Sequence, residues 1–249
     1  MINFFKKTVL VLALLSCGAS YSNPTQSLTA QAWLVADKDG QIIEGSHTND
    51  VRSIASITKL MTTMVVLDSG QSLLETLPKK LYGRNLTRLN LIELAMIKSD
   101  NNAAKMLCEF YPSGEDACIK AMNQKAFTLG MYNTIFTDPT GLFHTNVSTA
   151  QDLVKMVIAA SKYESIKEAS NKDRVAIPAT KNKSTVFNNT NSLVGKGYDF
   201  LVSKTGWITK SGGCIVMMVD TAKGIRTVVL LGSRNTKTRI PEAQLISQR

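Results

Sequence analysis

The order of the hydrophobic patterns constrains the fold of this chain more than any other feature. A strand-like run at 32–36 is followed by a turn at 37–40 and a short return strand, and the pattern becomes helical from Ser56 onward. Strand-like runs return only beyond Thr185. A late antiparallel group that rejoins the opening pair would form one sheet packed on the intervening helices. We therefore expect an α+β fold, an antiparallel sheet packed with helices and with a helical subdomain.

The middle of the chain carries the helical patterns. Apolar residues between Ile57 and Leu67 recur at spacings of three and four, and Gly70 ends that pattern. Further helices are expected over 91–97, 103–110, 115–129 and, from the capping box at 148–151, to Ala160. Late strands are expected at 200–202, 214–219 and 227–231. After them we expect one short terminal helix and no accessory domain.

The first 22 residues have the pattern of a secretory signal. Lys6 and Lys7 precede the apolar run 8–15, and small residues follow it. The run is shorter than the roughly 20 residues that a membrane-spanning helix needs. We therefore predict a signal peptide over 1–22 and a single exported domain over 23–249. A lipoprotein box that would leave a lipid on Cys17 is the less favoured alternative.

The chain is basic, with 29 Lys and Arg against 19 Asp and Glu and a formal net charge of +10. A basic exported domain is attracted to anionic neighbours such as phospholipid headgroups or cell-wall polymers. Peripheral association with a membrane or wall is one interpretation, and a surface whose charges only keep the protein solvated is the other. Nucleic acid is not an expected partner, because an exported chain without interleaved aromatic and basic residues has no such interface.

The cysteines and histidines leave little room for metal chemistry. Cys108 and Cys118 bracket a turn-like segment, so they form either a disulfide or a pair of buried thiols. Cys214 lies in an apolar run and is expected to be a buried small hydrophobe. His47 and His144 are the only histidines, and they show no metal-binding spacing, so we expect no metal.

Ser56 and Lys59 form the first chemical motif, Ser-x-x-Lys. Positions i and i+3 share a helix face, so the Lys59 amine can lie beside the Ser56 hydroxyl. A serine at a helix N-terminus also lies near backbone N–H groups that favour an oxyanion. The lysine can act as a base only if its pKa falls, which burial and a nearby cation would cause. The motif therefore predicts a second cation close to Lys59.

Lys204, in the sequence Lys-Thr-Gly, is the candidate for that second cation. The triplet follows the extended run 199–203 and should lie at a strand edge, where a peptide can pair by β-addition. Gly206 would let the backbone of that peptide approach closely. We expect Lys204 to hold a substrate carboxylate and to lower the pKa of Lys59.

A third motif, Ser99-Asp100-Asn101, lies at a predicted helix break. Side chains at such a break leave the helical ladder and can point into a cleft. Ser99 could relay a proton to a leaving amine, and Asn101 could hydrogen-bond a substrate amide.

The three motifs together are far more specific than any one of them. Ser-x-x-Lys is expected about once by chance in such a chain, but here the motifs occur in order at a helix start, a helix break and a strand. That set is the pattern of penicillin-binding proteins and class A β-lactamases. The chain resembles a low-molecular-weight penicillin-binding protein, a serine-type D-alanyl-D-alanine peptidase. The flanking segments, which look closest to the D-alanyl-D-alanine endopeptidase branch, are 53–61, 138–142, 146–150 and 189–191.

This resemblance implies a role for each motif residue. Ser56 would be the acyl-ester nucleophile and Lys59 its proton acceptor, with Ser99 and Asn101 completing the hydrogen-bonded centre. The backbone N–H groups of Ser56 and Trp207 would form the oxyanion hole. Lys204 and Thr205 would bind the terminal carboxylate of the substrate. The full set of residues implied to bind the substrate is Lys204, Thr205, Gly206 and Trp207.

The resemblance also implies a fold, a location and partners. The implied fold is the β-lactamase/DD-peptidase (transpeptidase-like) fold, and the implied location is the periplasm. The implied substrates are peptidoglycan stem peptides, the implied covalent inhibitors are β-lactam antibiotics, and no cofactor is implied. Two departures from the family pattern stand out: the stretch 59–99 is short, and the β-rich C-terminal domain of many carboxypeptidase relatives is absent. The second departure favours the endopeptidase branch over a D-alanyl-D-alanine carboxypeptidase.

Other functions remain as alternatives. A class A β-lactamase needs a glutamate-positioned water to release its acyl-enzyme, and no Glu-x-x-x-Asn follows Ser99, so long-lived acylation by penicillin is expected. A metallopeptidase lacks its histidine pair. A non-catalytic protein that binds penicillin or the cell wall would keep the fold without turnover, but such a site usually loses one of its motif residues.

Overall fold

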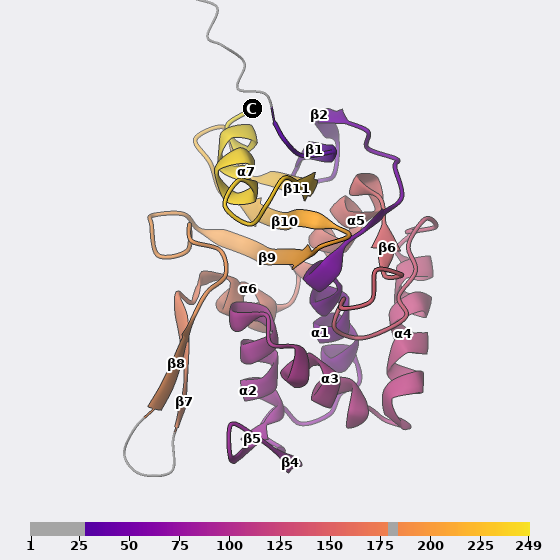
Figure 1. Ribbon diagram of the computed structural model, residues 1–249, viewed down its shortest axis with the longest axis vertical. Helices are drawn as coiled ribbons and strands as arrows, with labels where there is room; N and C mark the ends of the chain where they lie inside the picture. Colours follow the sequence, from indigo (N-terminus) through magenta and orange to yellow (C-terminus); the bar gives the residue numbers. More distant parts are fainter. Residues whose placement is uncertain (1–27, 179–183) are drawn as a thin grey trace, which may run out of the picture.

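The structure is a computed structural model that describes residues 28–178 and 184–249 (Figure 1). The predicted signal peptide at 1–22, with Cys17, lies outside the described residues and stays a prediction. Within the described ranges, no helix is both long and apolar enough to cross a membrane.

Strands from both ends of the chain form a five-stranded antiparallel sheet with the order β2-β1-β11-β10-β9. β1 pairs with β11 along its whole length, with Ala32 opposite Leu231 and Asp37 opposite Arg226. The late strands therefore rejoin the opening pair, as the sequence predicts. The strands of this sheet are β1 (Ala32–Asp37), β2 (Ile42–Ser46), β9 (Phe200–Ile208), β10 (Gly212–Val219) and β11 (Arg226–Ser233).

The predicted helices are confirmed within a few residues, with two differences in detail, and α6 is a further helix that was not predicted. The helix predicted from the capping box at 148–151 is instead capped by Thr149, whose side chain accepts a hydrogen bond from the Asp152 N–H. The second predicted helix ends in a π-helical turn, η2 (Leu94–Lys98). The helices are α1 (Thr58–Asp68), α2 (Arg88–Glu93), α3 (Asn101–Glu109), α4 (Gly114–Thr128), α5 (Ala150–Ala160), α6 (Glu164–Asn171) and α7 (Arg239–Ser247).

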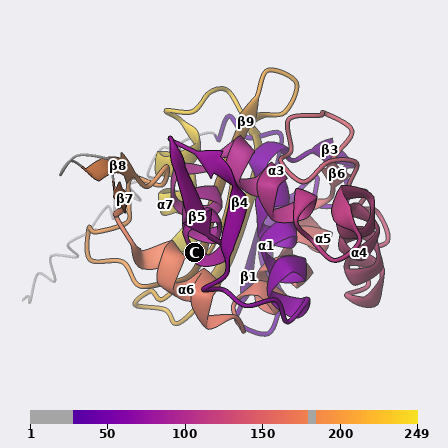
Figure 2. The ribbon, with the colours of Figure 1, turned by 90° about the horizontal axis from the view of Figure 1, so that it is seen from below.

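Among the residues that the structure describes, three short two-stranded sheets lie on the helical part of the molecule. Only the strand character beyond Thr185 was expected from the sequence. The hairpin β7–β8 projects away from the body in Figure 1, and Figure 2 looks onto β4 and β5 from below. The pairs are β3 (Arg52–Ser53) with β6 (Val147–Ser148), β4 (Thr76–Leu81) with β5 (Arg84–Thr87), and β7 (Arg174–Pro178) with β8 (Ser184–Asn188).

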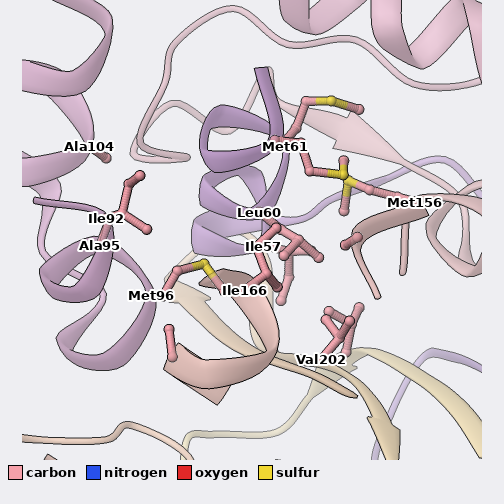
Figure 3. Close-up of a cluster of buried hydrophobic side chains, with 14 of the residues drawn as sticks. Ile57, Leu60, Met61, Ile92, Ala95, Met96, Ala104, Met156, Ile166 and Val202 are labelled. Atoms are coloured by element: carbon pink, nitrogen blue, oxygen red, sulfur yellow. The ribbon is translucent and has the colours of Figure 1, made fainter. Parts of the chain in front are cut away.

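Both faces of the large sheet are buried, because alternate side chains of each strand enter different cores. Along β10, Val216 and Met218 face the larger core, whereas Ile215 and Met217 pack in the smaller core beneath α7. The larger core joins the sheet to the helical part of the molecule. Figure 3 shows its centre, where side chains of α1, α5, α6, the α2–η2 segment and β9 converge; the labelled ones include Leu60, Met156, Ile166, Ile92 and Val202.

A disulfide ties two helices of the helical part together. Cys108, near the end of α3, is bonded to Cys118 in the second turn of α4. The structure thus selects the disulfide from the two interpretations of this pair. Cys214 is free and buried, as expected.

Candidate active site

Ser56 lies in a short 3₁₀ turn, η1 (Ala55–Ile57), immediately before α1. Its predecessor Ala55 has a left-handed backbone with φ of 47°, which an L-residue adopts only when its surroundings hold it there. The Thr58 hydroxyl donates a 2.8 Å hydrogen bond to the Ala55 carbonyl and braces the turn. The half-buried Ser56 is thereby presented from a tight, fixed turn.

Lys59 lies one turn further on, with its side chain fully buried. Its Nζ donates to Ser56 Oγ at 2.8 Å, to Asn101 Oδ1 at 2.7 Å and to the Thr140 carbonyl at 2.6 Å. A neutral amine has only two N–H donors and one lone pair. If Asn101 and Thr140 take the two donors, the lone pair points at the Ser56 hydroxyl, which is the arrangement a general base requires.

Burial lowers the pKa of Lys59 to about 7, although the negative charges of Asp138 and Asp100 act in the opposite direction. The expected fall in pKa is therefore present, and of its two expected causes burial is confirmed. The second expected cause, the charge of Lys204, is not among the groups that shift the pKa of Lys59. Near neutral pH, a large fraction of the Lys59 amine is neutral and able to accept a proton.

The loop at 138–141 holds both the lysine and the nucleophile. The Asp138 carboxylate accepts hydrogen bonds from the Thr140 N–H at 2.6 Å and the Gly141 N–H at 2.9 Å, which aims the Thr140 carbonyl at Lys59. Gly141 has φ of 78°, and a Cβ placed there would lie 1.9 Å from the Ala55 carbonyl oxygen. The loop thus packs backbone against backbone on the nucleophile turn. The sequence drew attention to this segment but assigned it no role.

Ser99 and Asn101 flank the junction between η2 and α3. Ser99 has a left-handed backbone with φ of 62° and ψ of 37°, which ends η2 and allows α3 to start in a new direction. Asp100 caps α3 through a 2.9 Å bond from the Ala103 N–H, and Asn101, the first residue of α3, reaches Lys59. Among the described residues, the Ser99 hydroxyl makes no direct hydrogen bond to Ser56 or Lys59. The predicted helix break is confirmed.

A surface cluster supports this junction from outside. The hydroxyl of Tyr82, at the β4–β5 turn, bonds to the Asp100 carboxylate and to Lys98, and Lys98 Nζ lies 2.9 Å from Asp100 Oδ2. The Phe187 ring of β8 lies 4.9 Å from the Tyr82 ring and 4.1 Å from Lys98 Nζ. Burial raises the pKa of Asp100, but the bonds from Tyr82 and Lys98 outweigh it and hold that pKa below its ordinary value. No sequence pattern pointed to this cluster.

Lys204 lies on the edge strand β9, as predicted, and is buried with 1% of its surface exposed. Its Nζ donates to the Thr205 carbonyl at 3.0 Å. Burial lowers the pKa of Lys204 well below its ordinary value, and the charges of Lys59 and Arg239 add to the effect. A buried amine of this kind gains most from an anionic ligand, because the ligand charge offsets the cost of its desolvation.

Arg239, the first residue of α7, also reaches this strand. Its guanidinium donates a 2.6 Å hydrogen bond to the Gly206 carbonyl, and the residue is 7% exposed. Its position in the sequence, far beyond the Lys-Thr-Gly motif, gave no signal of this contact, which depends on how α7 packs against the sheet.

Gly206 brings β9 directly against the nucleophile turn. A Cβ at this position would lie 2.9 Å from the Ile54 carbonyl oxygen and 3.0 Å from the Ser56 nitrogen. The glycine was predicted to make room for a substrate backbone, but the space it leaves is taken by the protein's own turn. The next residue, Trp207, is 46% exposed beside this contact. Thr205 donates a 2.7 Å hydrogen bond to the Thr190 hydroxyl.

Only part of β9 is open for pairing with another strand. In its first half, Asn171 of α6 bonds to both the Phe200 N–H and the Phe200 carbonyl, and Ser170 accepts from the Ser203 N–H at 2.9 Å. These side chains occupy backbone groups that an added strand would need. A peptide can therefore pair only with the second half of β9, beside Ser56.

The site thus joins the Ser56 hydroxyl, the Lys59 amine, the Asn101 amide and the buried Lys204 amine. Within residues 28–178 and 184–249, no group of His, Cys, Asp and Glu side chains is arranged to hold a metal ion. His144 is exposed on a loop. This set of groups can carry out acyl transfer with side chains alone.

Sequence comparison places this arrangement in a known family. The family model described as D-alanyl-D-alanine carboxypeptidase, peptidase S11, matches residues 19–80 and 75–235. A D-alanyl-D-alanine endopeptidase of Pseudomonas aeruginosa is 35% identical over 235 residues, which cover 88% of this chain and 76% of that protein. One of Escherichia coli K12 is 38% identical over 218 residues, covering 81% of this chain and 70% of that protein.

Solved structures agree with this result. Penicillin-binding protein D2 of Listeria monocytogenes, in its cefotaxime-bound form, is 25% identical with a TM-score of 0.79, covering 91% of this chain and 98% of that one. A Streptomyces K15 DD-transpeptidase variant shares the fold, with a TM-score of 0.81 at 24% identity over 89% of this chain and 97% of that one. The chain therefore belongs to the peptidase S11 family of serine D-alanyl-D-alanine peptidases.

Proposed function

We propose that this serine D-alanyl-D-alanine peptidase is a penicillin-sensitive endopeptidase that hydrolyses D-alanyl cross-links between peptidoglycan stems. The observation that carries its chemistry is the buried Lys59 amine, which lies 2.8 Å from Ser56 Oγ and has a pKa of about 7. The preference for cross-links rests on the relatives from Pseudomonas aeruginosa and Escherichia coli, which are named endopeptidases.

Acylation begins when Ser56 Oγ attacks the carbonyl carbon of the D-alanine on the donor side of the cross-link. Lys59 takes the hydroxyl proton as the new C–O bond forms. The backbone N–H groups of Ser56 and Trp207 bind the oxyanion. They can do so together because Gly206 lets β9 pack directly against the turn that carries Ser56, where an added Cβ would lie 3.0 Å from the Ser56 nitrogen. The C–N bond then breaks, and the proton passes from Lys59 to the leaving amine, with Ser99 as the relay.

Deacylation repeats these steps with water as the nucleophile. Lys59 accepts a proton from water, the hydroxide adds to the ester carbonyl, and Ser56 leaves with the returned proton. Lys204 and Thr205 hold a carboxylate of the substrate, or that of a penicillin. Burial of Lys204 makes such an anion the ligand that suits it best.

We further propose that the chain acts in the periplasm after removal of residues 1–22. The charged, apolar and small-residue segments of that stretch support this location. The net charge of +10 is consistent with contact between the protein and an anionic wall or membrane surface.

The test is digestion of purified sacculi with the mature chain, with and without benzylpenicillin, followed by separation and mass measurement of the muropeptides. Penicillin-sensitive conversion of cross-linked dimers into monomers is the expected result. Loss of only the terminal D-alanine from pentapeptides would identify a carboxypeptidase instead. Penicillin labelling without any change in the muropeptides would identify a non-catalytic binding protein.

Ser56→Ala is the control for this assay. The substitution removes only a half-buried hydroxyl, so the fold should persist while penicillin labelling and peptidase activity are both lost. Activity that survives in this variant would contradict the assignment of the nucleophile.

A further inference from the structure

A hollow of ≈ 270 Å³ lies just beyond the carboxyl end of β9 and has no part in the chemistry above. Its walls continue the segments that build the site: the run that leads into η1, the loop that follows Gly141, and the turn that follows β9. The lining residues are Val51, Arg52, Ser53, His144, Val147, Lys210 and Ser211.

The hollow is lined by basic side chains and by no acidic one. Arg52, His144 and Lys210 take part in none of the ion pairs found among residues 28–178 and 184–249. In the same part of the molecule, Arg52 Nε and Ser53 Oγ are buried without a hydrogen-bond partner. Buried polar atoms are normally paired, so the Arg52 and Ser53 side chains beside the hollow keep hydrogen-bonding capacity that no described residue uses.

The direction of a bound peptide decides which part of it would reach the hollow. If Lys204 holds the carboxylate and Ser56 attacks beside Gly206, the peptide runs antiparallel to β9. Its amino-terminal side must then continue past Trp207 toward the turn that carries Lys210. The other direction is closed, because Asn171 and Ser170 occupy the first half of the strand.

We propose that this hollow is an anion subsite that binds a carboxylate of the substrate on the amino-terminal side of the residue that acylates Ser56. The inference rests on the proposed function, since the direction of the peptide follows from the roles of Ser56 and Lys204. It adds a second charge requirement to the first: Lys204 selects an anion at one end of the peptide, and Arg52 with Lys210 selects an anion at the other.

The experiment measures how strongly the enzyme distinguishes a carboxylate from a carboxamide. One pair of peptide substrates consists of two stems joined by a D-alanyl cross-link and differs only in whether the acidic residue on the amino-terminal side of the donor D-alanine is free or amidated. A matching pair of penicillins carries an acyl side chain that ends in a carboxylate or a carboxamide. We expect kcat/KM and the rate of Ser56 acylation to be about tenfold higher for the free acid of each pair, the effect of one charged hydrogen bond.

The double substitution Arg52→Gln and Lys210→Gln should reduce that ratio to about one. Lys210→Glu, at an exposed position that does not threaten the fold, should favour the carboxamide. Lys223→Gln removes an exposed lysine from the turn at the far end of β10 and is the matched control, which should keep the tenfold ratio.

Each remaining outcome decides between the proposals. A wild-type ratio near one for both pairs would overturn the subsite, and so would a double variant that keeps the wild-type ratio. Discrimination between the penicillins without cleavage of either peptide would support the subsite and contradict the peptidase function. A protein that neither peptide nor penicillin acylates would contradict both.

Discussion

The two walls of the cleft are held together by different kinds of contact. The nucleophile wall, formed by η1, the loop at 138–141 and the second half of β9, packs backbone against backbone at two glycines. The Ser99 wall, formed by the triplet 99–101 with its supporting cluster of Tyr82, Lys98 and Phe187, is held by side chains at the surface. The first wall cannot shift without a clash, whereas the second can change by rotation of side chains.

This difference suits the work that each wall does. The Ser56 hydroxyl and the backbone donors next to it must keep their distances through the reaction, because misplacement by about 1 Å can reduce the rate of an enzyme about 100-fold. In the reaction that we propose, the Ser99 wall faces the part of the substrate that leaves. We therefore expect substitutions in the nucleophile wall to cost more stability than substitutions in the Ser99 wall.

Gly141→Ala tests the rigid wall and should have the largest effect. The new Cβ would lie 1.9 Å from the Ala55 carbonyl oxygen, at a residue with φ of 78°. We expect a loss of about 4 kcal/mol in the free energy of unfolding, measured by denaturant titration. Gly70→Ala is the matched control, since Gly70 has φ of 70° but nothing within 4 Å of an added Cβ, and should cost only about 1 kcal/mol. Equal losses in the two variants would refute the clash.

The disulfide anchors the helix that carries Asn101 and should have the next largest effect. Replacing Cys108 and Cys118 together by serine removes the cross-link between residues separated by 10 positions, which should cost about 3 kcal/mol of stability. A reducing agent should lower the stability of the wild type by a similar amount and leave the double variant unchanged. If the reductant destabilised both equally, the loss would have another origin.

The pH profile of acylation tests whether the walls are electrically coupled. The reactive form of Lys59 is the neutral amine, and its pKa is about 7, so the rate of penicillin acylation should rise about tenfold per pH unit below 7 and level off above it. Asp100 of the Ser99 wall raises the pKa of Lys59. Asp100→Asn removes that charge, favours the neutral amine and should move the acid limb to lower pH. An acid limb that stays in place would show that the walls are independent.

Tyr82→Phe tests the side-chain wall and should have the smallest effect. The variant loses one hydroxyl that bonds to Asp100 while its ring can still contact Phe187. We expect a loss of about 1 kcal/mol in stability and a severalfold slower acylation, with the pKa of Lys59 unchanged. Tyr132→Phe, at a highly exposed tyrosine beside Lys155 of α5, should change neither quantity. If Tyr82→Phe lowered the free energy of unfolding as much as Gly141→Ala does, the two walls would be equally rigid and the comparison would be wrong.

The sequence predicted which side chains come together in the site better than it predicted the surrounding residues that hold them in place. The pairing of Ser56 with Lys59 follows from helical spacing alone, and the strand position of Lys204 follows from its extended flank. Burial was correctly predicted as a cause of the lowered Lys59 pKa, but the predicted contribution of Lys204 was wrong because distances between charges depend on the packed molecule. The space left by Gly206 was given to the substrate because the sequence does not reveal that η1 packs there.

Other supporting residues could not be predicted, for reasons that differ. Tyr82 was missed because Pro78 and adjacent lysines obscure the alternation expected of β4. Arg239 reaches Gly206 through the packing of α7 on the far face of the sheet, which no local pattern encodes. The return of the late strands to the opening pair was predicted, because only the late strands were free to pair with that hairpin, whereas the order of the strands in the sheet was not predicted.

The way in which side chains cover the free edge of β9 affects how copies of this protein behave at high concentration. An unpaired strand edge invites another edge to join it, and that is how many sheet proteins aggregate. Here, Ser170 and Asn171 close half of the edge, and the other half carries Lys204 next to Arg239. Two such edges meeting side by side would bring the basic side chains of both molecules together with no anion between them. The basic groups that suit an anionic peptide therefore also disfavour the pairing of one molecule with the next.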